Sequence, residues 1–91
     1  MHYLMCKHRV ADFGLWKRTL REHAGMHAAA GLRARKIWRG VEDDQEIFFL
    51  FEVADLEKGR AFLAQLEAQR SSDRSKAADY PEMVLVTESS V

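Results

Sequence analysis

The apolar and polar positions along this chain fall into six segments whose spacing predicts alternating strands and helices. Four short segments have the length and composition of β-strands, and they cover residues 2–9, 32–39, 46–54 and 82–88. Polar or turn-forming residues separate them, including the connection GVEDDQ at 40–45, which has the length of a hairpin loop. These segments predict one small sheet.

Two further segments have apolar residues at helical spacing. The first begins at Phe13, with Asp12 as its N-cap, and is expected to continue to about Ala30, where Gly31 ends it. The second covers residues 56–69. Its N-cap is Asp55, its apolar positions are Phe62, Leu63 and Leu66, and Gly59 weakens it. The predicted order is therefore β-α-β-β-α-β.

This order is typical of ferredoxin-like α+β folds, in which two helices cover one face of a four-stranded antiparallel sheet. The chain contains no internal repeat and no linker-like segment long enough to separate two domains. We therefore expect a single ferredoxin-like domain over residues 1–91. In such a domain the second face of the sheet has no helix to cover it.

The third predicted strand, EIFFLFEV, is apolar on both faces. Because side chains alternate along a strand, one face carries four apolar residues, which are Ile47, Phe49, Phe51 and Val53, and we assign it to the helices. The opposite face has Phe48 and Leu50 between Glu46 and Glu52, the pattern of an interface core with a polar rim. A second copy of the chain is the expected cover, and the alternative is a modest exposed patch on a monomer.

The charge balance and the cysteine content indicate which classes of partner and which cellular compartment to expect. Fourteen basic residues balance fourteen acidic ones, so no net field attracts nucleic acid or a membrane surface. The first ten residues, MHYLMCKHRV, lack the apolar core and the cleavage site of a secretory signal, and no apolar run is long enough to span a bilayer. Its lone Cys6 excludes an internal disulfide. A cytoplasmic protein is expected.

The element order, VADFGLWKRTLREH after the first strand, and FEVADLEKGRAF from the third strand into the second helix resemble the dimeric α/β-barrel superfamily. The similarity extends over nearly the whole chain and points to small proteins grouped with antibiotic-biosynthesis monooxygenases. It implies homodimers that pair sheet to sheet and a pocket in each subunit between the sheet and the helices. Activities in the superfamily include cofactor-free oxygenation of aromatic polyketides, heme breakdown, isomerisation and cyclisation, so the fold alone assigns none.

His8 is the first candidate for a catalytic group. Alternation puts Leu4, Cys6 and His8 on one face of the first strand, and the resemblance implies that this face points toward the helices. An imidazole there would act as a general base or a hydrogen-bond donor near neutral pH. The alternative is a half-buried histidine at a strand end that bonds a backbone carbonyl.

His23 and His27 fall on or beside the apolar stripe of the first helix, with Phe13, Trp16 and Leu20. We take His23 as a second catalytic candidate and His27 as a ligand-binding one. Their i, i+4 spacing also suits a metal, but a site needs a third ligand and supporting residues. No metal is therefore expected, and histidines favoured by the helix C-terminal dipole are the alternative.

The predicted pocket has aromatic walls suited to a flat apolar ligand. Its ligand-binding candidates are Cys6, Trp16, His27, Phe49, Phe51 and Phe62, although aromatic residues at these spacings also build ordinary cores. Heme-degrading relatives carry a Trp on the second helix and a His near its end. Here Phe62 occupies that place and no histidine follows residue 27, so no heme or other cofactor is expected.

Two charged groups are interpreted as surface features. Arg33, Arg35 and Arg39 alternate along the second strand, an edge strand in this topology, where charges discourage aggregation; the alternative is binding of an anionic substrate. The acidic residues 42–44 are expected at a solvated hairpin tip. The expected function is a small-molecule-binding homodimer, either a cofactor-independent monooxygenase or isomerase of aromatic or polyketide-like compounds, or a ligand-binding or dimerisation module without catalysis.

Overall fold

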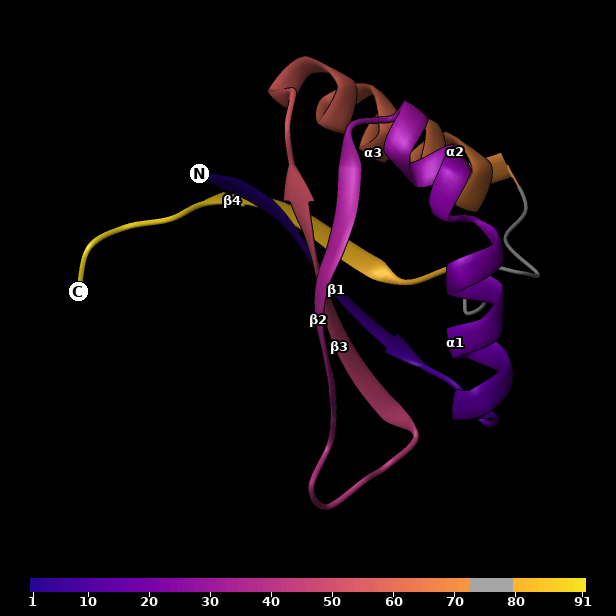
Figure 1. Ribbon diagram of the computed structural model, residues 1–91. Helices are drawn as coiled ribbons and strands as arrows, with labels where there is room; N and C mark the ends of the chain where they lie inside the picture. Colours follow the sequence, from indigo (N-terminus) through magenta and orange to yellow (C-terminus); the bar gives the residue numbers. More distant parts are fainter. Residues whose placement is uncertain (73–79) are drawn as a thin grey trace.

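The structure, a computed structural model, describes residues 1–72 and 80–91 and has an α+β fold. Four strands form one antiparallel sheet in the order β2-β3-β1-β4, and Figure 1 shows the three helices on one side of it. The strands are β1 (His2–Arg9), β2 (Leu32–Arg39), β3 (Glu46–Val53) and β4 (Glu82–Thr87). The helices are α1 (Phe13–Glu22), α2 (Ala24–Ala29) and α3 (Leu56–Ser72).

β1 and β2 are parallel to each other, as are β3 and β4, and each of these pairs has an antiparallel strand between its members. β3 lies between β1 and β2 and is antiparallel to both, so β1 and β2 run in the same direction. In the same way β1 lies between β3 and β4, which therefore also run in the same direction. Each parallel pair needs a connection across a face of the sheet. α1 and α2 lie in the connection from β1 to β2, and α3 lies in the connection from β3 to β4.

The predicted strands are confirmed to within a residue at their ends, and so are the faces of β3. Antiparallel pairing places Leu4 opposite Phe51 and Cys6 opposite Phe49. The helix-facing residues of the sheet form the core, whose buried members are Leu4, Cys6, Leu32, Ile47, Phe49, Phe51 and Val53. Period-two alternation therefore identified the buried face of β3 correctly.

The prediction of one helix from Phe13 to Ala30 is wrong. Asp12 does cap the helix by accepting a hydrogen bond from the Leu15 N–H at 3.0 Å, and Gly31 does end the segment with φ of 74°. Between them, however, the helix is interrupted at His23, and α1 and α2 point in different directions (Figure 1). Gly25, two residues later, lowers the helix propensity at this point, so the break costs little free energy.

α3 begins at its predicted cap, since Asp55 Oδ1 accepts from the N–H groups of Glu57 at 3.0 Å and Lys58 at 3.3 Å. It continues to Ser72, beyond the expected end. Gly59 is buried in it, and a Cβ atom there would lie 2.9 Å from Cγ1 of Val53. The glycine that weakens this helix locally thus permits the close approach of α3 to β3.

β2 is an edge strand, as predicted, but its arginines do not alternate regularly. A register shift between Ala34 and Lys36 inserts an extra residue, which is a β-bulge. After it, Arg39 lies opposite the buried Ile47 and its guanidinium carbon lies 4.5 Å from the ring centroid of Phe13. Arg35 instead pairs with Glu52 at 3.5 Å. Arg35 and Arg39 therefore contact different residues, Glu52 and Phe13.

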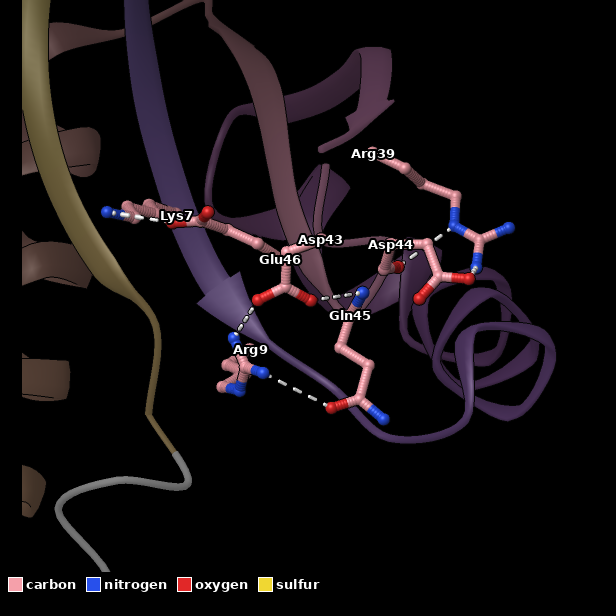
Figure 2. Close-up of polar contacts among 7 residues, drawn as sticks. All are labelled: Lys7, Arg9, Arg39, Asp43, Asp44, Gln45 and Glu46. Carbon is pink, nitrogen blue, oxygen red and sulfur yellow. Dashed lines mark hydrogen bonds and ion pairs between the residues drawn. The ribbon is translucent and has the colours of Figure 1, made fainter. Parts of the chain in front are cut away.

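Two of the three acidic residues of the β2–β3 connection, Asp43 and Asp44, pair with cations, which the expectation of a solvated tip did not include. Figure 2 shows Arg9 of β1 beside Asp43 and Gln45, and Arg39 beside Asp44. Arg39 Nε also donates to the Asp44 carbonyl at 3.1 Å, and Lys7 pairs with Glu46 at 2.9 Å. These contacts hold the hairpin loop against the end of β1.

The face of the sheet away from the helices carries exposed apolar side chains. Its most accessible members are Met5, Trp38, Phe48 and Val84, each between 37% and 53% exposed. A shallow hollow of about 620 Å³ lies over this face, between residues that include Tyr3, Trp38 and Leu50. Within residues 1–72 and 80–91, no helix is both long and apolar enough to cross a bilayer.

Candidate functional site

A hollow of about 380 Å³ lies between the sheet and the helices. Phe49 and Phe51 of β3 form its buried floor, being 5% and 2% exposed. α1 and α2 contribute Trp16, Thr19, Leu20, His23, Met26 and His27. α3 contributes Phe62 and Leu66, and the strand ends add His8, Tyr80, Pro81 and Met83. We call this space the aromatic hollow.

Its floor and walls are joined by ring contacts. Trp16 packs on Phe49 with 4.9 Å between ring centroids, and Phe49 meets Phe51 edge to face at 5.8 Å. His27 lies 5.0 Å from Phe51 and 6.2 Å from Phe62. Contacts of this kind fix ring positions, because offset and edge-to-face arrangements are the favoured ones. The walls are therefore set before any ligand binds.

His27 is the histidine most enclosed by apolar rings. Burial lowers the pKa of its imidazole, and the neighbouring His23 lowers it further by charge repulsion. Since an unperturbed histidine titrates near pH 6.5, His27 is neutral at pH 7. A neutral imidazole has one nitrogen that accepts a hydrogen bond and one that donates. His27 can therefore accept a hydrogen bond from a ligand hydroxyl group.

His8 and His23 occupy the edges of the aromatic hollow. His8 is half-buried near the end of β1, opposite Ile47 of β3. His23 is exposed at the break between α1 and α2, and its ring centroid lies 6.3 Å from that of His27. With exposed Thr19 and Met26 it forms the solvent side of the hollow.

The structure brings seven of the eight predicted site residues together and leaves one out. The seven that line the aromatic hollow are His8, Trp16, His23, His27, Phe49, Phe51 and Phe62. Cys6 points to the same side of the sheet but is only 2% exposed and does not line the hollow. Burial raises the pKa of its thiol to about 12, so it is neither a nucleophile nor a ligand contact. Cys6 is a core residue.

Sequence reasoning missed Tyr80 and Met26. Tyr80 lines the hollow beside His8 and Pro81, while Tyr3 lies on the opposite face of the sheet. Met26 was missed because it falls off the stripe of a single straight helix. The break at His23 turns α2 and brings Met26 to the rim. The sequence feature that could have placed Tyr80 in the hollow was its position just before the last strand.

A second, polar hollow of about 540 Å³ shares a wall with the first. His8 and Tyr80 line both spaces. The remaining lining residues of the polar hollow are all charged, and they are Lys7, Arg9, Glu46, Arg70 and Glu82. The described lining of the aromatic hollow, in contrast, contains no Asp, Glu, Lys or Arg.

The arrangement suits a flat apolar molecule that carries a few hydrogen-bonding groups. Its aromatic faces would stack on the walls, while His8, His27 and Tyr80 offer donors and acceptors. In the described part of the chain, no group of three or more His, Cys, Asp or Glu side chains is placed to hold a metal ion. Comparison with known proteins gave no match to any family model, curated protein or solved structure.

Proposed function

We propose that this protein binds a small, flat apolar or aromatic molecule in the aromatic hollow. The observation that carries the proposal is the convergence of three histidines and five other aromatic rings, from both the sheet and the helices, around one space of about 380 Å³. That volume lies within the range of small-molecule sites, which are mostly apolar and contain a few placed polar groups.

The reaction proposed for this site is cofactor-independent oxygenation or isomerisation of an aromatic or polyketide-like compound. His27 or His8 would take a proton from an acidic hydroxyl or methylene group, leaving an enolate against the apolar walls and an imidazolium beside it. In isomerisation the proton returns to another carbon. In oxygenation dioxygen is the oxidant: a methylene becomes a carbonyl and one water leaves, so no further reductant is needed.

A ligand-binding module without catalysis is the second candidate. It is favoured by the small number of polar groups in the aromatic hollow and by the absence of a charged side chain from its described lining, because little there would stabilise a developing negative charge. Both candidates require ligand binding, and they differ only in whether His27 or His8 moves a proton.

The proposed assembly is a cytoplasmic homodimer of ferredoxin-like subunits that pair through their sheets, as in dimeric α/β barrels. Support comes from the interleaved strand order, with β3 between β1 and β2, and from the partly exposed Met5, Trp38, Phe48 and Val84 on the face without helices. A second sheet would remove these side chains from water, which is favourable in proportion to the apolar area covered. The single free thiol fits a reducing compartment.

Filling the hollow tests the binding proposal. Thr19→Phe should place a ring at its rim and weaken binding of 2-naphthol, measured by calorimetry, by about tenfold or more, as loss of roughly 1.4 kcal/mol would. Leu15→Phe is the matched control, because Leu15 is 52% exposed one turn earlier on α1 and does not line the hollow. Equal affinities of both variants and the unmodified protein for 2-naphthol would show that the aromatic hollow is not its binding site.

Oxygen uptake then separates the two candidates. The unmodified protein, His27→Phe and His8→Gln would each be mixed with a panel of hydroxylated naphthalenes and anthrones under air. Catalysis predicts uptake that at least one of the two substitutions abolishes while 2-naphthol still binds. Binding without uptake across the panel would favour the module without catalysis.

A further inference from the structure

The polar hollow adjoins the aromatic hollow. Both spaces contact His8 and Tyr80, so these two side chains form their common wall. A ligand seated on Phe49 and Phe51 could therefore project a substituent past His8 and Tyr80 without leaving the protein surface. The chemistry of the polar hollow then selects that substituent.

The described charges around the polar hollow leave Arg70 as the cation for an anion, while the carboxylate of Glu82 acts on Lys7. Three cations, Lys7, Arg9 and Arg70, face two carboxylates, Glu46 and Glu82. Lys7 and Glu46 neutralise each other at 2.9 Å, and Arg9 is engaged by Asp43 of the hairpin loop. Arg70 remains as the cation with the weakest partner, because its NH1 atom lies 3.7 Å from Glu67, beyond hydrogen-bonding distance.

Arg70 is also held in position. Its NH2 group donates to the Pro81 carbonyl at 2.8 Å, and its side chain is only 28% exposed. A guanidinium has five N–H donors in a fixed plane, and this hydrogen bond to Pro81 uses one of them. A restrained, partly desolvated guanidinium is suited to binding a carboxylate through two parallel hydrogen bonds.

We propose that the ligand is an aromatic carboxylate, with its rings in the aromatic hollow and its carboxylate bound by Arg70 in the polar hollow beyond His8 and Tyr80. The proposal rests on the proposed function and adds its ligand class. The described lining of the aromatic hollow has no cation, so a charged group left there would be desolvated without compensation. Lys7 adds a second positive charge nearby and is expected to contribute less than Arg70, because Glu46 already pairs with it.

The test compares two probes of the same shape, 2-naphthoate and its neutral methyl ester, by calorimetry on the full chain. The carboxylate should bind at least about tenfold more tightly, as expected for one charge-assisted hydrogen bond. Arg70→Gln should remove this preference and leave binding of the ester unchanged. Arg60→Gln is the matched control, because Arg60 lies on the same helix, pairs with Glu57 and does not line the hollow.

Two further variants keep the proposal testable if Arg70→Gln unfolds. Arg70→Lys retains the charge but not the paired donors, so it should lose part of the preference, and Lys7→Gln should lose a smaller part. Equal binding of both probes, or a preference that survives all three substitutions, would refute carboxylate binding by Arg70. Neither result would contradict ligand binding in the aromatic hollow. Failure of both probes to bind, when 2-naphthol also does not bind, would instead overturn the proposed function itself.

Discussion

The imidazole of His27 packs against the buried ring of Phe51, with 5.0 Å between the ring centroids. The contact ties a residue of the candidate site to the core of the sheet. It also keeps water from one side of the imidazole, which is why burial lowers its pKa. The stability of the fold and the protonation of the site are therefore linked.

This link predicts a loss of stability on mild acidification. The pKa of His27 is lower in the folded protein than the value near 6.5 expected after unfolding, so the unfolded chain binds more protons between the two values. The free energy of unfolding should be at its full value above about pH 6.5 and should fall as the pH drops through that window toward the folded pKa. Chemical denaturation between pH 7.5 and 5 would measure it.

His27→Phe separates this effect from other titrations, because phenylalanine keeps a ring beside Phe51 and has no proton to gain. The variant should show a flatter dependence of stability on pH. His2→Gln, at the start of β1 and outside the hollow, should keep the acid-side loss because it retains His27. An unchanged slope in His27→Phe would contradict the assignment.

Gly59→Ala should destabilise the protein although alanine favours helix. The new Cβ would lie 2.9 Å from Cγ1 of buried Val53, and this overpacking should cost about 1–3 kcal/mol. Gly25→Ala is the matched control, since a Cβ there meets nothing within 4 Å, and it should stabilise by about 0.5–1 kcal/mol. Urea denaturation of both variants gives the comparison, and a stabilised Gly59→Ala would mean that α3 lies farther from β3.

The hairpin contacts predict a perturbed carboxyl group at Asp43. The side-chain hydrogen bond from Arg9 lowers the pKa of Asp43, and the backbone N–H of Gln45 lowers it further. Carbon-detected NMR titration should show this pKa rising toward its ordinary value in Arg9→Gln. Arg39→Gln should leave it unchanged, because Arg39 pairs with Asp44. Stability should change little, since the pair is exposed and solvent screens it.

The proposed dimer predicts a light-scattering mass of twice the 10.5 kDa chain. Leu50→Asp should give the monomer mass, because pairing of the sheets would bury its carboxylate without a partner. Val41→Asp makes the same chemical change at a 97% exposed position in the hairpin loop and should remain dimeric. A monomeric unmodified protein would refute sheet pairing directly.

Much of the fold was predictable because local chemistry specifies it. β3 and β4 follow from short apolar segments rich in aromatic or β-branched residues, and the caps Asp12 and Asp55 satisfy N–H groups only a few residues away. The helix-facing side of β3 follows from the two-residue period of a strand. Each of these features depends on neighbours in the sequence.

The candidate site was predictable in part, because the same periods that build the core place Trp16, His27 and Phe51 on facing surfaces. The sequence pattern includes Cys6 in the predicted pocket and omits Tyr80 for one reason. Alternation tells which face a residue occupies but not how far the covering helices extend over it. Cys6 is buried in the core, at 2% exposed, whereas a hollow remains farther along β1, where Tyr80 enters from just before β4.

The sequence by itself determined the strands, the caps, the order of elements and the buried face of β3, since all of these depend on contacts within a few residues. Only the tertiary structure decided the break at His23, the bulge that directs Arg39 toward Phe13, and the shared wall of His8 and Tyr80. These features depend on how a helix of limited propensity and a twisted edge strand pack against distant residues. Packing of that kind can override local preference, because burying a side chain is worth more than the few tenths of a kcal/mol that separate most residues in helix propensity.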